Sequence, residues 1–399
     1  NWSEFEQPTS QMIGHDYIDL LCMDFDPKKE GHVMVGAKGG VYEFQDGKFI
    51  KHYGRQNSVL ESGVNSDNYT IVSTLKYTDN GDLWVLNSMV DNPIWKIEHG
   101  SGNWVNYPHL EMSTPAKYNL VSLLQSHNKN IMWFANNYYM ENRLYAYDFV
   151  NDKLVGHGPN FTNEDGTVIT PIMVYALAED LDGNVWIASS NGPFYISSAD
   201  AIAGNDAFIQ HKVPRNDGTN LADYLLSDVK TRCIAVDGAN RKWMGTENGV
   251  FLISSDCNTL LQHFTTENSP LPSNTVYDIC IDNNSNIVYF ATERGLCSYA
   301  SDATQPSEEM TKDNVYAYPN PVTPEYTGKI TIVGLSFNAD VKIVTSNGVL
   351  VNQGRSTGGS YQWDVRDLKG KRVASGVYMV QAATETGDKG VVCRIAVVN

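Results

Sequence analysis

Short strand-like runs that end in Gly- or Asn-containing turns recur along the first 300 residues of the chain. Their apolar side chains alternate with polar ones or form short continuous runs, as in half-buried and buried β-strands. After each turn, three residues past a Gly or Asn, comes an aromatic residue or Met: Met34, Trp84, Trp133, Trp186, Trp243 and Tyr289, which are 46 to 57 positions apart. A repeat of about 50 residues filled with short strands is typical of a β-propeller.

Each repeat has the pattern of a four-stranded blade. The fifth repeat predicts strands at 229–236, 242–246, 249–253 and 260–264, with Gly249 at a tight turn where a positive φ is tolerated. The first predicts strands at 20–25, 33–37, 40–44 and 48–53, and the fourth at 174–179, 185–189, 194–197 and 208–213. No stretch keeps a helical apolar period for three turns, so we expect very little helix.

The two ends of the repeat region predict how the ring closes. The first six residues resemble the fourth strand of a repeat, and the sixth repeat lacks that strand after Tyr299. We therefore expect residues 1–302 to form a six-bladed propeller whose N-terminal strand completes the last blade and leaves no open edge. Seven blades are the alternative, with the seventh supplied upstream. The chain starts at Asn1 rather than at Met, so we expect processing or truncation.

The remaining residues predict a second all-β domain. Residues 303–314 are polar and without periodicity, as in a linker. Strand-like runs at 329–333, 340–345, 361–365, 376–381 and 390–398 then predict an immunoglobulin-like β-sandwich over residues 315–399. The fold class is therefore all-β, a propeller followed by a small sandwich.

Charge divides the chain in the same way. The formal net charge is −17, yet residues 305–399 contain 10 of the 29 Lys and Arg residues and 9 of the 46 Asp and Glu residues. The acidic excess therefore belongs to the repeats. Such a surface repels nucleic acid, whose recognition needs clustered Lys and Arg, so we expect no nucleic-acid partner.

The six cysteines do not form a metal-binding pattern. Cys22, Cys233 and Cys280 fall at related places in first strands, where a small buried residue is expected, and free thiols are favoured over disulfides. No run of 18 apolar residues occurs, so no membrane-spanning segment is expected.

A search for catalytic motifs finds none. The nine histidines are scattered without an HxH or HExxH pair, and there is no GxSxG, P-loop or EF-hand loop. Asp180, Asp182 and Asp79 lie in turns between first and second strands, where Asp usually forms the turn rather than a calcium site. We therefore expect no catalytic residue, no metal and no cofactor.

Loops that enter the first strand of each blade line the mouth of a propeller's channel, and several carry aromatic and amide side chains. Such side chains suit stacking on sugar rings and hydrogen bonding to hydroxyl groups. The candidate ligand-binding residues, chosen by their position in the repeat, are Asn68, Tyr69, Tyr118, Asn119, Tyr224 and Asn274.

The motifs of the repeats are similar to a known type of propeller. The run from Trp243 to Val250, of the form W-x-G-T-x-x-G-V, resembles the two-component-regulator repeat found in periplasmic sensor regions of Bacteroidetes hybrid histidine kinases. This resemblance covers residues 1 to about 300 and implies an architecture rather than an activity.

The end of the chain resembles the C-terminal sorting domain of type IX secretion cargo. The residues that carry the resemblance lie in a Y-P-N-P run, an S-N-G turn and a G-V-Y strand start: Pro319, Asn320, Pro321, Gly348, Gly376 and Tyr378. Together the two parts resemble the attachment-complex proteins of the type IX secretion system, in which two propellers precede the sorting domain.

That resemblance implies an exported, non-enzymatic scaffold between the periplasm and the outer-membrane surface of a Bacteroidetes-type bacterium. Its implied partners are a sortase-like protease, an outer-membrane shuttle and a glycan or lipopolysaccharide. Two alternatives remain open: a ligand-sensing or glycan-binding propeller, and a polysaccharide lyase or hydrolase with converging catalytic groups at the channel mouth.

Overall fold

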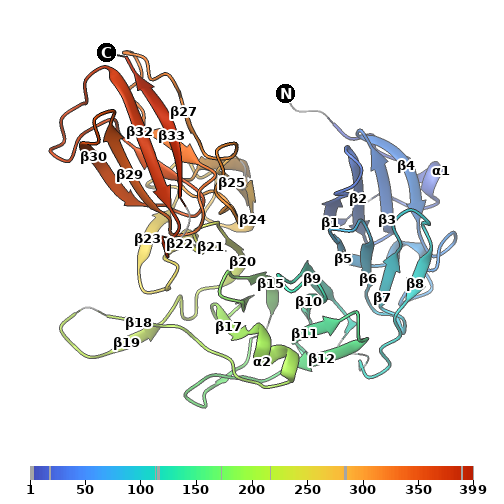
Figure 1. Cartoon of the computed structure of the whole chain (residues 1–399). Helices are drawn as coiled ribbons and strands as arrows, with labels where there is room; N and C mark the ends of the chain where they lie inside the picture. The colour runs from blue at the N-terminus through green and yellow to red at the C-terminus, as the bar shows by residue number, and fades with distance from the viewer. Residues whose placement is uncertain are drawn as a thin grey trace. The chain divides into compact units, whose positions relative to one another are not determined.

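The computed structural model describes residues 4–17, 19–112, 114, 117–171, 173–215, 217–282, 285–387 and 390–398. The chain forms two compact units, Asn1–Cys233 and Ile234–Asn399, and the division falls within strand β20 (Thr231–Val236). Both units are built from antiparallel β-sheets (Figure 1), which confirms the predicted all-β class.

Three sheets of the first unit each contain four strands that pair in chain order. The first sheet is β1 (Leu20–Phe25), β2 (His32–Ala37), β3 (Gly40–Gln45) and β4 (Lys48–Tyr53). The second is β5 (Val72–Tyr77), β6 (Leu83–Asn87), β7 (Ile94–Ile97) and β8 (Trp104–Asn106). The third is β9 (Leu120–Gln125), β10 (Ile131–Asn136), β11 (Arg143–Asp148) and β12 (Lys153–His157). The strands predicted for the first repeat are thus confirmed to within one residue.

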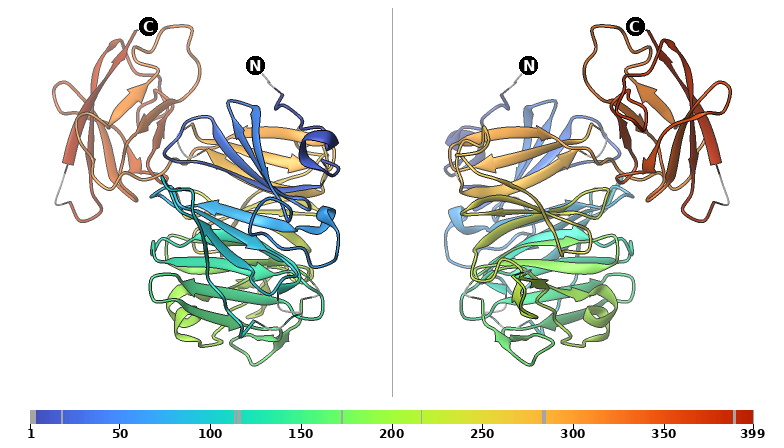
Figure 2. Two further views of the ribbon diagram at one scale, coloured as in Figure 1. Left: turned by 90° about the vertical axis from the view of Figure 1, so that its right-hand side faces the viewer. Right: turned by 90° about the vertical axis from the view of Figure 1, so that its left-hand side faces the viewer.

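A fourth sheet of the first unit has three strands: β15 (Val174–Glu179), β16 (Asn184–Ser189) and β17 (Phe194–Ser197). The first strands of successive sheets lie side by side, β1 with β5, β5 with β9 and β9 with β15. The sheets, coloured blue to green, follow one another in Figure 2. This succession of inner strands is the arrangement of propeller blades.

A β-bulge interrupts the inner strands close to their starts. The register shifts between Leu20 and Cys22, between Val72 and Thr74, and between Val174 and Ala176. In β9 the strand is irregular at Ser122, whose φ is +59°. A bulge turns the following side chain and increases the local twist of the strand.

The side chain that follows the bulge caps the next inner strand. Thr74 Oγ1 accepts a hydrogen bond from the Leu123 amide at 2.8 Å, and Ser122 Oγ accepts one from the Leu177 amide at 2.7 Å. Cys22 holds the corresponding place in β1, and its thiol donates to Val72 O of β5 at 3.9 Å. Burial raises the pKa of Cys22 to about 12, so this group stays a thiol.

Of the recurring Met and aromatic residues, Met34, Trp84 and Trp133 pack between neighbouring sheets, whereas Tyr289 is 36% exposed. In three apolar clusters, Met34 lies with Val72 and Val85, Trp84 with Phe134, and Trp133 with residues of β15 and β16. Met34, Trp84 and Trp133 are 3% exposed or less. Burial of such large side chains supplies much of the free energy that holds the sheets together.

The fourth repeat departs from its prediction. The predicted strand at 208–213 is wrong, because only Ile209 bridges to Tyr195, and β18 (Lys212–Pro214) pairs with β19 (Ala222–Tyr224) instead. Helix α2 (Ser198–Ala203) intervenes after β17. Its N-cap, Ser197, accepts from the Asp200 amide, and Gly204 ends the helix at φ +86°.

The other short elements of the first unit are α1 (Ser10–Ile13), the 3₁₀ turn η1 (Asp67–Tyr69), β13 (Phe161–Thr162) and β14 (Val168–Ile169). Helix content is low, as predicted. Residues 1–3 lie outside the described part of the chain, and residues 4–7 form no strand. The Glu6 amide donates to Gly47 O at 2.7 Å. Closure of the last blade by the opening strand, like the number of blades, stays a prediction.

The second unit begins with two more repeat sheets. One is β20 with β21 (Lys242–Thr246), β22 (Gly249–Ile253) and β23 (Leu260–Phe264), as predicted. The other has three described strands, β24 (Val276–Asp282), β25 (Ile287–Thr292) and β26 (Gly295–Ala300).

The C-terminal part of this unit is a two-sheet sandwich. One sheet contains β27 (Tyr316–Tyr318), β28 (Ile330–Val333) and β31 (Tyr361–Trp363). The other has the order β30-β29-β32-β33, from β29 (Asp340–Thr345), β30 (Leu350–Arg355), β32 (Gly376–Ala383) and β33 (Gly390–Val397). Trp363, Ile343 and Ile395 lie in its core. The predicted runs match these strands except β27 and β30, which were not predicted. Since the compact units divide at 233, the expected boundaries near 302 and 315 stay a prediction.

We predict that Thr74→Val and Ser122→Ala each lower the melting temperature of the chain. Each substitution leaves an amide between two inner strands without its side-chain acceptor, which costs about 1–3 kcal/mol. For a unit of this size, the expected decrease is about 2–4 °C per kcal/mol. Thermal unfolding followed by circular dichroism measures it. Ser73→Ala, one residue away in β5, is the matched control, and an equal decrease in that control would contradict the assignment.

Candidate functional site

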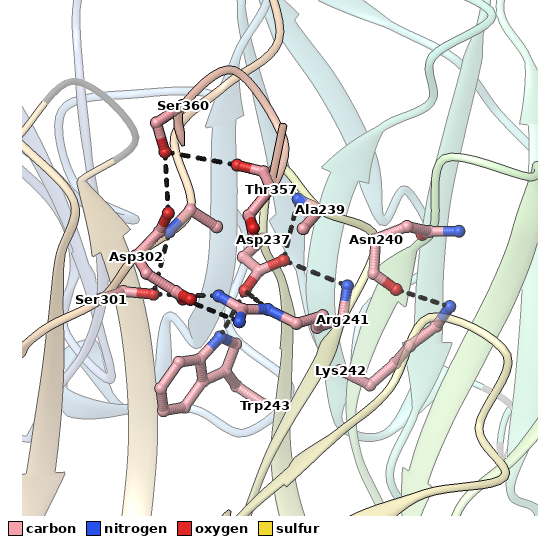
Figure 3. Close-up of polar contacts among 11 residues, drawn as sticks. Asp237, Ala239, Asn240, Arg241, Lys242, Trp243, Ser301, Asp302, Thr357 and Ser360 are labelled. Carbon is pink, nitrogen blue, oxygen red and sulfur yellow. Dashed lines mark hydrogen bonds and ion pairs between the residues drawn. The ribbon is translucent and has the colours of Figure 1, made fainter. Parts of the chain in front are cut away.

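Three segments of the second unit meet around the turn between β20 and β21 (Figure 3). The first is the turn itself, at residues 237–241. The second is the connection that follows β26, at residues 301–305, and the third is the sandwich loop at residues 357–360. The turn belongs to a repeat sheet and the loop to the sandwich. This cluster, which we call the junction, therefore fixes how the sandwich follows the repeats within this unit.

Asp237 is the centre of the junction. One carboxylate oxygen accepts from the Ala239 and Arg241 amides at 3.0 and 3.1 Å. The other accepts from Arg241 Nε at 2.8 Å and from Trp243 Nε1 at 3.0 Å. Asp237 is only 2% exposed, so these donors compensate the loss of hydration of a buried carboxylate.

Arg241 connects this turn to the chain that follows β26. Its Nη2 donates to Ser301 Oγ at 3.1 Å, and its Nη1 lies 2.8 Å from Asp302 Oδ1 (Figure 3). Burial lowers the pKa of Arg241, but the carboxylates of Asp237 and Asp302 outweigh burial and raise its pKa above the ordinary value. The guanidinium thus holds two chain segments together in its charged form.

Backbone atoms approach closely on the other side of the junction. A Cβ on Gly238 would lie 1.9 Å from Thr304 O, and one on Gly358, whose φ is +60°, would lie 2.3 Å from the same atom. Thr304 O accepts from the Gly359 amide, and Ser360 Oγ donates to Asp302 O at 2.7 Å. Only glycine allows these contacts, so the connection is packed against the sandwich rather than extended as a free tether.

The corresponding turn of the fourth sheet shows which contacts of the junction recur in another repeat. There Asp180 accepts from Trp186 Nε1 at 2.9 Å and from the side chain and amide of Asn184. The predicted turn-forming role of this Asp is confirmed. Asn184 occupies the position that Arg241 has in the fifth sheet. The longer arginine side chain extends the contacts of the turn to residues 301–302.

The predicted mouth residues fall in different places. Asn68 and Tyr69 lie in η1. Tyr118 and Asn119 immediately precede β9, where the Tyr118 ring lies 4.8 Å from that of Tyr138 and Asn119 Nδ2 donates to Asn137 O at 3.0 Å. Their ligand-binding role stays a prediction.

Two other predicted mouth residues hold turns together. Tyr224, at the end of β19, donates to Asp165 Oδ2 at 2.7 Å and accepts from Asn163 Nδ2, which joins the β18–β19 and β13–β14 hairpins. Asn274 Oδ1 accepts from the Thr266 amide at 2.8 Å in the second unit. Their ligand-binding role is likewise a prediction, although these bonds already give both side chains a structural role.

A polar cluster between the first two sheets was not predicted. His32 lies between Asp26 Oδ2 at 3.1 Å and Glu43 Oε1 at 2.9 Å, and Tyr53 donates to Glu43 at 2.8 Å. These residues and Tyr77 line a cavity of about 350 Å³. Burial raises the pKa of both tyrosines, so they remain donors. Asp26 follows β1, His32 begins β2 and Glu43 lies within β3, so no recognisable spacing connects the three groups and no sequence signal marks them.

The sorting-motif residues at the start of the sandwich fasten its last strand. Pro319 and Pro321 follow cis peptide bonds on either side of Asn320. Asn320 Nδ2 donates to Arg394 O at 2.8 Å, and its Oδ1 accepts from the Ala396 amide at 3.0 Å. The side chain thus bonds to β33 beside the backbone of Val322, whose amide donates to Ala396 O at 2.8 Å, and the two residues together cover this sheet edge.

The remaining motif residues form turns and core contacts. Gly348 has φ +81° in the turn between β29 and β30, and Gly376 begins β32. Tyr378 is buried, its ring lies 5.5 Å from that of Trp363, and its hydroxyl donates to Ala374 O at 2.8 Å. A tyrosine bonded to the backbone a few residues upstream is a feature of immunoglobulin-like sandwiches. Nothing in the geometry of the described residues identifies a receptor, so a sorting role stays a prediction.

Searches for other kinds of site add two observations. Among the residues that the structure describes, no group of three or more His, Cys, Asp or Glu side chains is placed to hold a metal ion. None of the described helices has the length and hydropathy needed to cross a bilayer.

These features define an all-β protein of the β-propeller type that carries a C-terminal sandwich. No protein-family model and no curated protein matches the sequence. Among solved structures, the chain is similar to PorZ of Porphyromonas gingivalis, described as an essential bacterial surface component of the type IX secretion system. The two are 26% identical with a TM-score of 0.65, over 95% of this chain and 52% of PorZ. The chain therefore spans about half the length of PorZ.

Weaker similarities extend to other propellers. The extracellular domain of a protein described as a hybrid two-component system of B. thetaiotaomicron is 13% identical with a TM-score of 0.47, over 95% of this chain and 50% of that one. A second such domain from the same bacterium is 14% identical with a TM-score of 0.45, over 99% and 57%. The similarity to PorZ confirms the resemblance to type IX secretion proteins that the repeats and the C-terminal motifs indicated.

We predict that Arg241→Ala destabilises the second unit. The substitution leaves Asp237 buried without its main charged partner, which costs about 3–5 kcal/mol. Limited proteolysis should then cleave within residues 301–314, a segment that we expect to resist cleavage in the unmodified chain. Arg294→Ala, a substitution in the turn between β25 and β26, is the control. Unchanged cleavage and melting temperature in Arg241→Ala would show that the junction does not depend on the guanidinium.

We also predict that Asn320→Ala weakens the attachment of β33. Two hydrogen bonds to the strand are lost, with an expected cost of about 1–3 kcal/mol. Hydrogen exchange of the Ala396 amide measures the effect directly and should become faster. Gln353→Ala on the exposed strand β30 serves as the control. Protection of Ala396 that is equal in all three proteins would contradict the role of Asn320.

Proposed function

We propose that the chain is part of a non-enzymatic surface component of a type IX secretion system. In this role it assists a sortase-like protease in attaching cargo proteins to anionic lipopolysaccharide. The observation that carries the proposal is the similarity to PorZ, which extends over 95% of the chain at 26% identity and a TM-score of 0.65. A match of that extent includes the sandwich as well as the repeats, whereas a propeller alone would suggest only a common scaffold.

The ionisable groups of the first unit support a binding role over catalysis. His32, the best candidate for a general base, already contacts Asp26 and Glu43 through its two ring nitrogens. A general base must face a substrate, whereas both ring nitrogens of His32 face side chains of its own sheet. The cluster therefore supports a structural role rather than catalysis.

The sandwich supports the placement of the protein in an export pathway. One of its motif residues, Asn320, bonds directly to the last strand, β33. We propose that the outer-membrane shuttle recognises this sandwich and that the protein works at the outer-membrane surface. The repeat sheets would then offer a rigid face to a protein or glycan partner.

The proposal can be tested by deleting the gene that encodes the chain in the bacterium that carries it. We expect proteins with a type IX sorting domain to lose their attachment to lipopolysaccharide and to be found in the medium or the periplasm. Immunoblots of surface, medium and periplasmic fractions measure the change. Export of a protein without a sorting domain is the control, and complementation with the intact gene should restore attachment. Normal attachment in the deletion strain would overturn the proposal.

A further inference from the structure

A second cavity lies in the C-terminal unit, beside the connection that leads into the sandwich. It has a volume of about 390 Å³, which is large enough for one or two sugar rings. Its walls come from the connection, through Thr304 and Gln305, and from the first sandwich sheet, through Tyr316, Tyr318 and Val333. None of the residues assigned to the sorting motif lines it.

Two tyrosines of strand β27 form one side of this cavity. Tyr316 and Tyr318 lie on the same face of the strand because side chains alternate along it, and Ala317 between them is buried. Their rings are 56% and 42% exposed, with centroids 6.2 Å apart and planes inclined at 40°. A strand of a packed sheet holds them in this position, so a ligand gains two aromatic faces with little loss of side-chain entropy.

A buried hydroxyl group in the same wall lacks a partner. Thr304 is 7% exposed, and its Oγ1 makes no hydrogen bond with any described residue. The surrounding chain covers this oxygen, and a Cβ on Gly359 would lie 2.8 Å from it, so the hydroxyl faces the sandwich loop rather than the cavity. Gln305, which is exposed on the same wall, adds an amide that can both donate and accept.

The charge of the lining narrows the class of ligand. The seven lining residues are Thr304, Gln305, Asn314, Tyr316, Tyr318, Val333 and Gly334, and none of them is charged. Another cavity of the same unit, near Phe337, contains Glu308 and Glu385 and differs in this respect. A site with aromatic faces, amides and a hydroxyl but no charge suits a neutral, hydroxyl-rich molecule.

We propose that this cavity binds a neutral sugar unit of a glycan, with Tyr316 and Tyr318 stacking on the ring and Gln305 bonding its hydroxyl groups. The proposal goes beyond the secretion role and does not depend on it, because its ligand is a free carbohydrate.

Calorimetric titration of the whole chain with maltohexaose, α-mannotriose and N-acetylchitotriose tests the proposal. We expect at least one of these probes to bind at millimolar concentration or below. Tyr316→Ala and Tyr318→Ala should each weaken that binding about tenfold by removing a stacking face. Gln305→Ala removes the exposed amide and should weaken it about fivefold.

Tyr316→Phe retains the aromatic face, so its affinity should stay within about twofold of the unmodified chain. Phe337→Ala removes an exposed ring from the other cavity and should leave binding unchanged. Circular dichroism shows whether each variant is folded. If a tyrosine variant unfolds, the exposed Gln305→Ala substitution provides the test instead. Absence of binding by all three probes, or equal binding by Gln305→Ala and the unmodified chain, would overturn the proposal. Preferential binding of an acidic trisaccharide of galacturonate would overturn it too.

Discussion

One short hydrogen bond between neighbouring inner strands underlies the arrangement of the first unit. Sheets that follow one another in a propeller face each other through side chains, so their backbones cannot form a common ladder. At the bulges of β5 and β9, a small polar side chain, Thr74 or Ser122, reaches across and accepts from the next strand's amide. In β1, Cys22 instead donates from its thiol to Val72 O of β5 at 3.9 Å. The apolar clusters built around Met34, Trp84 and Trp133 provide most of the attraction between the sheets, but they are not directional. The capping bond adds the direction that fixes one inner strand against the next.

The turn that follows the inner strand contains a second recurring interaction, in which an aspartate accepts hydrogen bonds from its neighbours. In the fourth sheet, Asp180 satisfies the turn amides and the indole of Trp186, and the interaction remains local. In the fifth sheet the same carboxylate position also binds Arg241, which extends the network to Ser301 and Asp302. A single change of side chain therefore converts a turn that only stabilises its own blade into a contact with a distant segment. The glycine contacts at 238 and 358 exclude side-chain atoms from the same place, so the charge network and the close backbone approach reinforce each other.

The sequence predicted the repeated sheets well because each blade combines two local signals, a period of about 50 residues and turn residues with few allowed conformations. The fourth strand of the fourth repeat was wrong because Ser197 and Gly204 cap a helix at that point, and a six-residue helix has too few positions to show a period. The junction was missed for a different reason. Its arginine is visible next to Asp237, but Ser301 is 60 positions away, and no spacing within a repeat connects the two. Asn320 was identified by resemblance, yet its bonds to Arg394 and Ala396 depend on the folded sandwich and could not be read from the motif.

The uneven distribution of charge along the chain affects where an anionic ligand can bind. The acidic excess lies in the repeats, whereas residues 305–399 have 10 basic and 9 acidic residues. At about 0.1 M salt, charges more than about 10 Å apart are largely screened, so the repeats repel an anionic ligand mainly at their own surface. The sandwich imposes no comparable penalty, and the uncharged cavity at Tyr316 and Tyr318 is insensitive to the sign of a ligand's distant groups. A glycan with both neutral and anionic units would therefore approach the sandwich through a neutral unit. Its charged units would remain in solvent, where their hydration is retained.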